Sequence, residues 1–153
     1  MKNIFIHVAA YVAAIILLQT LYFKFTAQPE SVYIFSTLGI EPVGRIGSGI
    51  AELVAGILLL IPKMRIWGSF IALSVISGAI LSHLFFLGIE VQGDGGTLFL
   101  LAVTVFVACL FILIARREET IALVKSLLKK GWKTRKDSLR LIPFYGIKYS
   151  KNV

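Results

Sequence analysis

The sequence of 153 residues is poor in cysteine, histidine and acidic side chains, with one, two and eight of them respectively. The single cysteine, Cys109, excludes an internal disulfide and a CxxC redox pair, so redox chemistry would require a bound cofactor or a partner chain. The two histidines, His7 and His83, stand far apart and lack the ligand spacing of a metal site. We therefore expect no metal centre.

Basic residues are concentrated at the C-terminal end. Residues 116–153 hold eleven Lys and Arg against three acidic residues, whereas residues 1–115 hold five of each sign, so the tail carries the whole net charge of +8. A basic segment beside an apolar domain is typical of a cytoplasmic tail that contacts anionic lipid headgroups. That electrostatic role is sufficient for the tail, and we do not expect nucleic-acid binding.

Apolar residues make up 58% of the chain and fall into four long runs. Each run is close to the roughly 20 residues that a helix needs to cross a bilayer. The predicted fold is all-α, with a four-transmembrane-helix bundle in residues 1–115 and a C-terminal amphipathic basic helix within the tail, 116–153. The four predicted spans are 4–23, 42–61, 66–87 and 97–115.

The first run, 4–23, also fits a signal peptide, which starts with a short basic segment followed by an apolar stretch. The bulky residues 21–25 argue against it, because cleavage sites need small side chains. Basic residues flank the start of the first span, the turn after the second and the end of the fourth, whereas acidic residues dominate the other ends. The positive-inside rule then predicts a multi-pass protein of the bacterial inner membrane with both termini cytoplasmic.

The second predicted span contains two charges, Arg45 and Glu52. They are seven residues apart, which places them on nearly the same helix face but about 10 Å apart along the axis, too far for direct contact. A charge inside a bilayer costs about 2.5 to 3.5 kcal/mol on insertion scales and needs a partner. We therefore expect Glu52 to have its partner on another helix.

The topology brings five polar residues to the end of the bundle opposite the termini: Lys24, Arg45, Glu52, His83 and Asp94. A hydrogen bond between Glu52 and His83 would make a group able to pass a proton near neutral pH, and these two are the candidate catalytic residues. Arg45, with Asp94 and Lys24, is the candidate ligand-binding set; Arg45 could hold Asp94, Glu41 or an anionic ligand.

Each of these residues also has a purely structural interpretation. Arg45 and Glu52 could form a polar clasp between helices, and His83 could bond a loop carbonyl. Asp94, within Gly93–Gly96, could form a turn, and Lys24 could extend toward the headgroups.

Three further segments have a predicted structure. Residues 32–35 suit a short helix at the membrane interface. Ser74, Gly78 and Ser82 recur every four residues and predict a small-residue stripe for close helix packing. Ile121, Val124, Leu127 and Leu128 form the apolar stripe of the tail helix, and residues 137–153 are expected to be loosely ordered.

Two motifs resemble the DoxX family of membrane proteins. Residues 41–62 resemble its glycine-rich second helix, R-x-x-x-G-x-x-E-L-x-x-G-x-x-L-L, and the second motif is Gly78–Leu84 followed by Gly93–Phe99. The resemblance covers residues 1–115 and implies a four-helix integral membrane protein. Family members are associated with a terminal oxidase, with thiosulfate:quinone oxidoreductase and with assembly roles, but the family supplies no settled set of catalytic residues.

Three functions are compatible with these features. The first is an integral subunit of a quinone-linked membrane oxidoreductase, for which quinone is the expected cofactor and a protein partner or homo-oligomer is needed. The second is a non-catalytic assembly or chaperone subunit that binds other membrane proteins. The third is a small-solute carrier, which the short chain and the lack of an inverted repeat make the least favoured.

Overall fold

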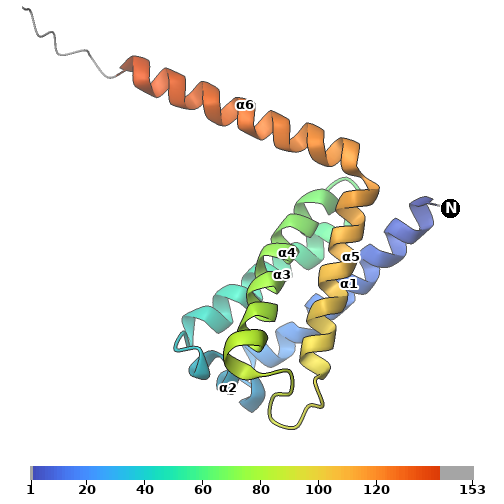
Figure 1. Ribbon diagram of the computed structural model, residues 1–153, viewed down its shortest axis with the longest axis vertical. Coiled ribbons are helices and arrows are strands. Elements are labelled where there is room, and N and C mark those ends of the chain that lie inside the picture. The colour runs from blue at the N-terminus through green and yellow to red at the C-terminus, as the bar shows by residue number, and fades with distance from the viewer. Residues whose placement is uncertain (1, 142–153) are drawn as a thin grey trace, which may run out of the picture. The chain divides into compact units, whose positions relative to one another are not determined.

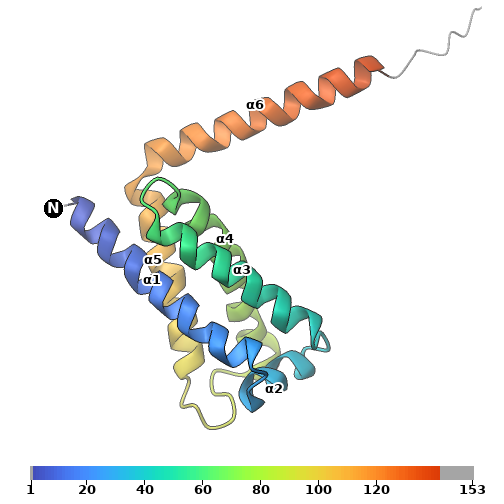
Figure 2. The same ribbon diagram turned by 180° about the vertical axis from the view of Figure 1, so that it is seen from behind.

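The computed structural model describes the backbone of residues 2–141 and the side chains of residues 3–129. The chain divides into two compact units, Met1–Arg117 and Glu118–Val153. All regular structure in the described part is helical, which confirms the all-α prediction (Figures 1 and 2).

Four helices of the first unit form the bundle. α1 packs beside α3, α3 beside α4, α4 beside α5, and α5 closes the ring against α1. Each is long and apolar enough to cross a membrane, the third span including a short π-helix, η1, that continues α4. The prediction of four membrane-spanning helices is thereby confirmed, and the fold is that of a multi-pass membrane protein. The bounds are α1 Lys2–Phe25, α3 Val43–Leu60, α4 Arg65–Ser82, η1 His83–Leu87 and α5 Thr97–Ala115.

Successive long helices run in opposite directions, which gives the bundle two distinct ends (Figure 2). The proximal end consists of the start of α1, the turn between α3 and α4, and the end of α5. The distal end consists of the end of α1, α2 (Pro29–Thr37), the start of α3, and η1 with its following loop. The short helix expected around residues 32–35 is therefore present as α2. Pro29 occupies its first turn, where the missing N–H costs nothing.

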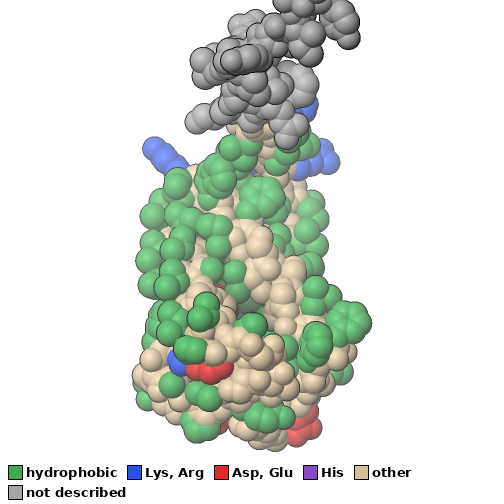
Figure 3. All heavy atoms as spheres, turned by 90° about the vertical axis from the view of Figure 1, so that its left-hand side faces the viewer, with side chains coloured by type: hydrophobic (Ala, Val, Ile, Leu, Met, Phe, Trp, Pro, Cys, Tyr) green, Lys and Arg blue, Asp and Glu red, His purple; other side chains and the backbone are tan. Residues whose placement is uncertain are grey.

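Alanines line much of the centre of the bundle beside larger residues such as Leu17, Leu59 and Ile112, and short side chains let helices approach closely. The larger apolar side chains mostly point outward, and Figure 3 shows hydrophobic side chains predominating on one face, with acidic and basic groups near its lower end. An apolar exterior suits a lipid environment. The buried alanines are Ala10, Ala13, Ala14, Ala55, Ala72 and Ala102.

The closest helix approach involves Gly68 of α4. A Cβ built on Gly68 would lie 2.8 Å from the backbone nitrogen of Leu59 and 3.0 Å from the carbonyl oxygen of Ala55, both in α3. The predicted stripe of Ser74, Gly78 and Ser82 does not make such a contact within the described bundle, since a Cβ on Gly78 meets nothing within 4 Å. That prediction was wrong about the packing face, because spacing alone does not say which way a helix is turned.

α6, Arg117–Leu141, belongs to the second unit except for its first residue. The predicted amphipathic basic helix is present, and its apolar stripe is exposed: Ile121, Val124, Leu127 and Leu128. The helix continues through Asp137 to Leu141, so the expectation of loose order was wrong for residues 137–141. For residues 142–153 that expectation lies outside the described part of the chain.

Candidate functional site

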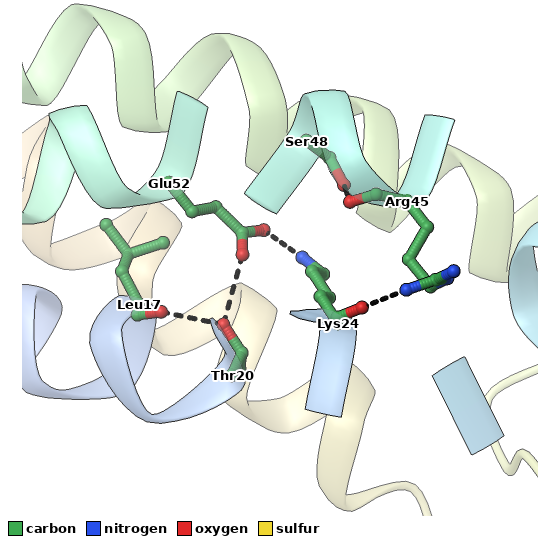
Figure 4. A network of polar contacts seen from close by, with 6 residues as sticks. All are labelled: Leu17, Thr20, Lys24, Arg45, Ser48 and Glu52. Atoms are coloured by element: carbon green, nitrogen blue, oxygen red, sulfur yellow. Dashed lines mark hydrogen bonds and ion pairs between the residues drawn. The ribbon is translucent and has the colours of Figure 1, made fainter. Parts of the chain in front are cut away.

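Glu52 is the buried acid at the centre of the site. It lies on α3, is only 3% exposed, and forms an ion pair with the ammonium of Lys24 on α1 (Figure 4). The second carboxylate oxygen, Oε2, lies 3.0 Å from the hydroxyl of Thr20, one turn before Lys24. The expected partner on another helix therefore exists, and it is Lys24.

Thr20 orients the carboxylate through a shared hydrogen. Its hydroxyl lies 2.7 Å from the carbonyl oxygen of Leu17 and 3.0 Å from Glu52 Oε2, and both oxygens are acceptors. The Thr20 hydroxyl has one hydrogen for these two acceptors, so Glu52 Oε2 receives only part of a hydrogen bond from it. The Glu52 carboxylate thus depends mainly on the Lys24 ammonium for its stabilisation.

Arg45 forms a second charged group about two turns before Glu52. Its Nη2 lies 2.7 Å and its Nε 2.8 Å from Oε1 of Glu41, an i,i+4 pair at the start of α3. Its Nη1 donates to the backbone carbonyl of Lys24, close to the end of α1. Of the two side chains predicted as partners for Arg45, Glu41 and Asp94, Glu41 makes the contact.

Lys24 connects the two charged groups, since its side chain bonds Glu52 and its carbonyl accepts from Arg45 (Figure 4). The Lys24 side chain is 15% exposed and that of Glu52 only 4%. The ammonium also lies 6.0 Å from the ring centroid of Phe35 in α2. A ligand that approaches from outside the bundle would therefore meet the Lys24 ammonium before the carboxylate.

His83 follows its structural alternative, a bond to a loop carbonyl. Its Nδ1 lies 2.8 Å from the carbonyl oxygen of Gly88, which can only accept, so Nδ1 carries the hydrogen. The N–H of Gly88 in turn donates to the carbonyl of His83 at 2.9 Å, and the imidazole packs edge-on against Phe99. The predicted hydrogen bond between His83 and Glu52 is not among the contacts of the described residues. His83 instead holds the loop that follows η1.

Asp94 organises the loop before α5. Oδ1 accepts from the N–H groups of Val91 and Gly96 at 2.8 and 2.9 Å, and Oδ2 accepts from Leu98 at 2.9 Å. The structural alternative, a turn former, thus describes the observed contacts. The predicted bond to Arg45 is not formed, because the carboxylate is taken up by backbone donors.

The surroundings of Asp94 lower its pKa below the ordinary value of 3.8. Burial acts in the opposite direction, but the bonds from Leu98, Val91 and Gly96, with the nearby positive field of His83, outweigh it. A carboxylate with a lowered pKa stabilises the folded state above its unfolded pKa, and this contribution is lost as the pH falls through the folded pKa. The loop should therefore loosen only in acid.

Replacing Asp94 by asparagine tests this assignment. Asp94→Asn keeps one acceptor oxygen but turns an N–H group toward the N–H of Leu98, so we expect a loss of about 1 kcal/mol, as for a lost helix cap. Thermal unfolding of the purified protein would measure it. The variant should also lose less stability than the parent as the pH is lowered below about 4. Identical acid profiles of parent and variant would contradict the assignment.

A third polar group, at the proximal end, was missed in the sequence analysis. Arg65 was assigned there only to the basic flank of a span, and His7 to the interface. In the structure Arg65 is 2% exposed, and its Nη1 lies 3.0 Å from Nδ1 of His7. Both residues stand at span ends, where exposed charges are common, so sequence position gave no sign of the burial.

Comparison of the chain with family models, curated proteins and solved structures finds no match. The geometry itself defines the class. The protein is a multi-pass membrane protein with four candidate spanning helices and an interhelical ion pair buried at the distal end.

Proposed function

We propose that the chain is an integral subunit of a quinone-linked membrane oxidoreductase and that Lys24 and Glu52 form its quinone-binding pair. The observation that carries the proposal is the buried carboxylate of Glu52 bonded to the ammonium of Lys24, a residue whose side chain keeps 15% exposure. Charged side chains inside a membrane domain are costly, and they commonly mark proton or substrate paths.

The pair has the groups that quinone chemistry uses. The Lys24 ammonium can donate a hydrogen bond to a quinone carbonyl, and the Glu52 carboxylate can accept a proton from a quinol hydroxyl. Electrons would pass to or from a partner chain, since the sequence offers no redox pair of its own. Arg45 would act as a positioning residue, because it binds the Lys24 carbonyl and Glu41.

The resemblance of residues 41–62 and of the later glycine-rich motif to the DoxX family supports the same class of function. We place the protein in a bacterial inner membrane with both termini in the cytoplasm, because basic residues gather at the proximal end. In that orientation the Lys24–Glu52 pair faces the outer half of the bilayer. The exposed apolar stripe of α6 suits contact with the inner leaflet.

Quinone binding tests the proposal. The purified full chain in nanodiscs would be titrated with ubiquinone and menaquinone analogues, and retained quinone would be measured by native mass spectrometry. We expect binding by the parent and at least tenfold weaker binding by the double variant Lys24→Met, Glu52→Leu, which removes both charges together. Lys63→Met is the matched control, because Lys63 is an exposed lysine at the proximal end.

Equal binding by the parent and the double variant would contradict the assignment of the site. A parent that binds neither quinone would contradict the oxidoreductase proposal itself. Loss of binding in the Lys63→Met control would indicate that a general charge effect, and not the pair, governs the result.

A second function, an assembly subunit without catalysis, is favoured by the outward position of Gly78 and Ser74. Both are exposed, and a Cβ on Gly78 meets nothing within 4 Å, so a helix of another protein could approach α4 closely here. This function predicts a stoichiometric membrane partner that co-purifies with the parent and is lost with Gly78→Leu. The oxidoreductase site at Lys24 should be unaffected by that change.

A further inference from the structure

Arg65 is the most deeply buried charged side chain in the described part of the bundle, at 2% exposure. Its Nε donates to the carbonyl of Leu59 at 3.0 Å, and its Nη1 donates to Nδ1 of His7 at 3.0 Å. The guanidinium carbon lies 5.5 Å from the ring centroid of Tyr11. Its Nη2 is fully buried and has no hydrogen-bond partner.

No carboxylate neutralises this cation within the described residues. The ion pairs Lys24–Glu52 and Arg45–Glu41 both lie at the distal end. The partners of Arg65 are a carbonyl, an imidazole and an aromatic ring, all uncharged when His7 accepts through Nδ1. A guanidinium does not give up its proton in proteins, and burial of an uncompensated charge is expensive.

The stability of α4 does not explain why an arginine occupies position 65. Arg65 is the first residue of α4, where the helix dipole disfavours positive charge and favours an anion. The bond to the carbonyl of Leu59, near the end of α3, offsets this unfavourable interaction only in part. That carbonyl is uncharged and accepts from only one of the guanidinium nitrogens. The position is therefore one at which an added negative group would be stabilised twice, by the guanidinium and by the helix end.

The site can be reached from the membrane surface. Arg65 begins the third span and His7 lies in the second turn of the first, so the guanidinium stands near the level of the headgroups. Its covering groups, His7 and Tyr11, are both on α1 and are themselves exposed. A change of rotamer in these two side chains would remove their contacts with the guanidinium.

We propose that Arg65, with His7 and Tyr11, forms a binding site for a phosphate oxyanion, supplied by an anionic phospholipid headgroup or by free phosphate. The oxyanion accepts a charge-assisted hydrogen bond from Nη2 and neutralises the buried guanidinium. The proposal is independent of the Lys24–Glu52 pair, which lies at the opposite end of the bundle. It is also distinct from the basic surface of α6, which does not include Arg65.

Lipid retention in native mass spectrometry tests the site. The full chain would be loaded with phosphatidylglycerol, with diacylglycerol, which lacks the phosphate, or with inorganic phosphate, and sprayed from concentrated ammonium acetate, which screens exposed charges over a few ångströms. We expect the parent to retain one phosphatidylglycerol more tightly than diacylglycerol. Arg65→Gln should reduce this preference roughly tenfold, the value of about 1.4 kcal/mol in binding.

Lys63→Gln is the matched control, since it removes an exposed charge from the same end and should keep the preference. If inorganic phosphate is retained and competes with the lipid, the oxyanion site stands and its source is soluble. If the parent retains phosphatidylglycerol and diacylglycerol equally and holds no phosphate, the proposal is overturned, even where Arg65→Gln fails to fold. Equal losses in Arg65→Gln and Lys63→Gln would also overturn it, because they would indicate a general surface charge effect.

Discussion

Replacing Glu52 by glutamine should lower the free energy of unfolding by about 3 kcal/mol. The change leaves the Lys24 ammonium without its counter-charge in a position only 15% exposed, and breaking one side of a buried ion pair typically costs 3 to 5 kcal/mol. We expect the lower end of that range, because the Lys24 side chain is not fully buried. Unfolding of the purified protein in mixed micelles of increasing denaturing detergent would measure the loss.

The double variant Lys24→Met, Glu52→Leu provides the control. It removes both charges and supplies apolar side chains of similar size, and such replacements are often neutral or stabilising. The bond from Arg45 remains, because it goes to the Lys24 backbone carbonyl. We therefore expect the double variant to lie within about 1 kcal/mol of the parent. A double variant as unstable as Glu52→Gln would contradict the ion-pair explanation.

Adding a single methyl group at Gly68 should destabilise the bundle by about 2 kcal/mol. In Gly68→Ala the new Cβ would lie 2.8 Å from the nitrogen of Leu59 and 3.0 Å from the oxygen of Ala55. These are backbone atoms of α3 and cannot rotate away, so α3 and α4 must move apart. The loss exceeds the gain of up to about 1 kcal/mol that alanine brings to a helix. Thermal unfolding would show the effect.

Gly78→Ala is the matched control on the same helix. A Cβ there meets nothing within 4 Å, so only the gain in helix propensity remains, and stability should stay equal or rise. The opposite signs of the two substitutions are the test. Destabilisation of similar size at both positions would contradict the explanation that Gly68 is needed for the close approach of α4 to α3.

Much of the fold could be predicted from sequence because spanning helices depend on length and apolarity, both of which are visible in the chain. The four spans, the short α2 and the amphipathic α6 are all present. The small-residue stripe around Gly78 was assigned to the wrong kind of contact, since the rotation of a helix about its axis depends on its neighbours. Gly68, which does make the close approach, is followed four residues later by the buried Ala72, a small-residue spacing that was not singled out in the sequence.

The candidate site could be predicted only in part. Because burying a charge is costly, a partner for Glu52 on another helix could be predicted correctly. The order of the spans also predicted that Lys24 lies at the same end of the bundle. The choice between Lys24 and His83 depended on distances of a few ångströms, which topology does not determine. The proposed roles of Glu52, His83, Arg45, Asp94 and Lys24 in chemistry stay predictions.

The π-helix η1 changes the direction in which the chain leaves the third span. Its turn from His83 to Gly88 contains one residue more than an α-helical turn, so the chain enters the following loop about 100° further round than an unbroken α4 would place it. Removing one residue between Leu84 and Leu87 would restore the α-helical spacing and swing the loop to another side of the bundle. A homologue that differs by one residue at this point would therefore present a different surface at the distal end, even with the loop sequence unchanged.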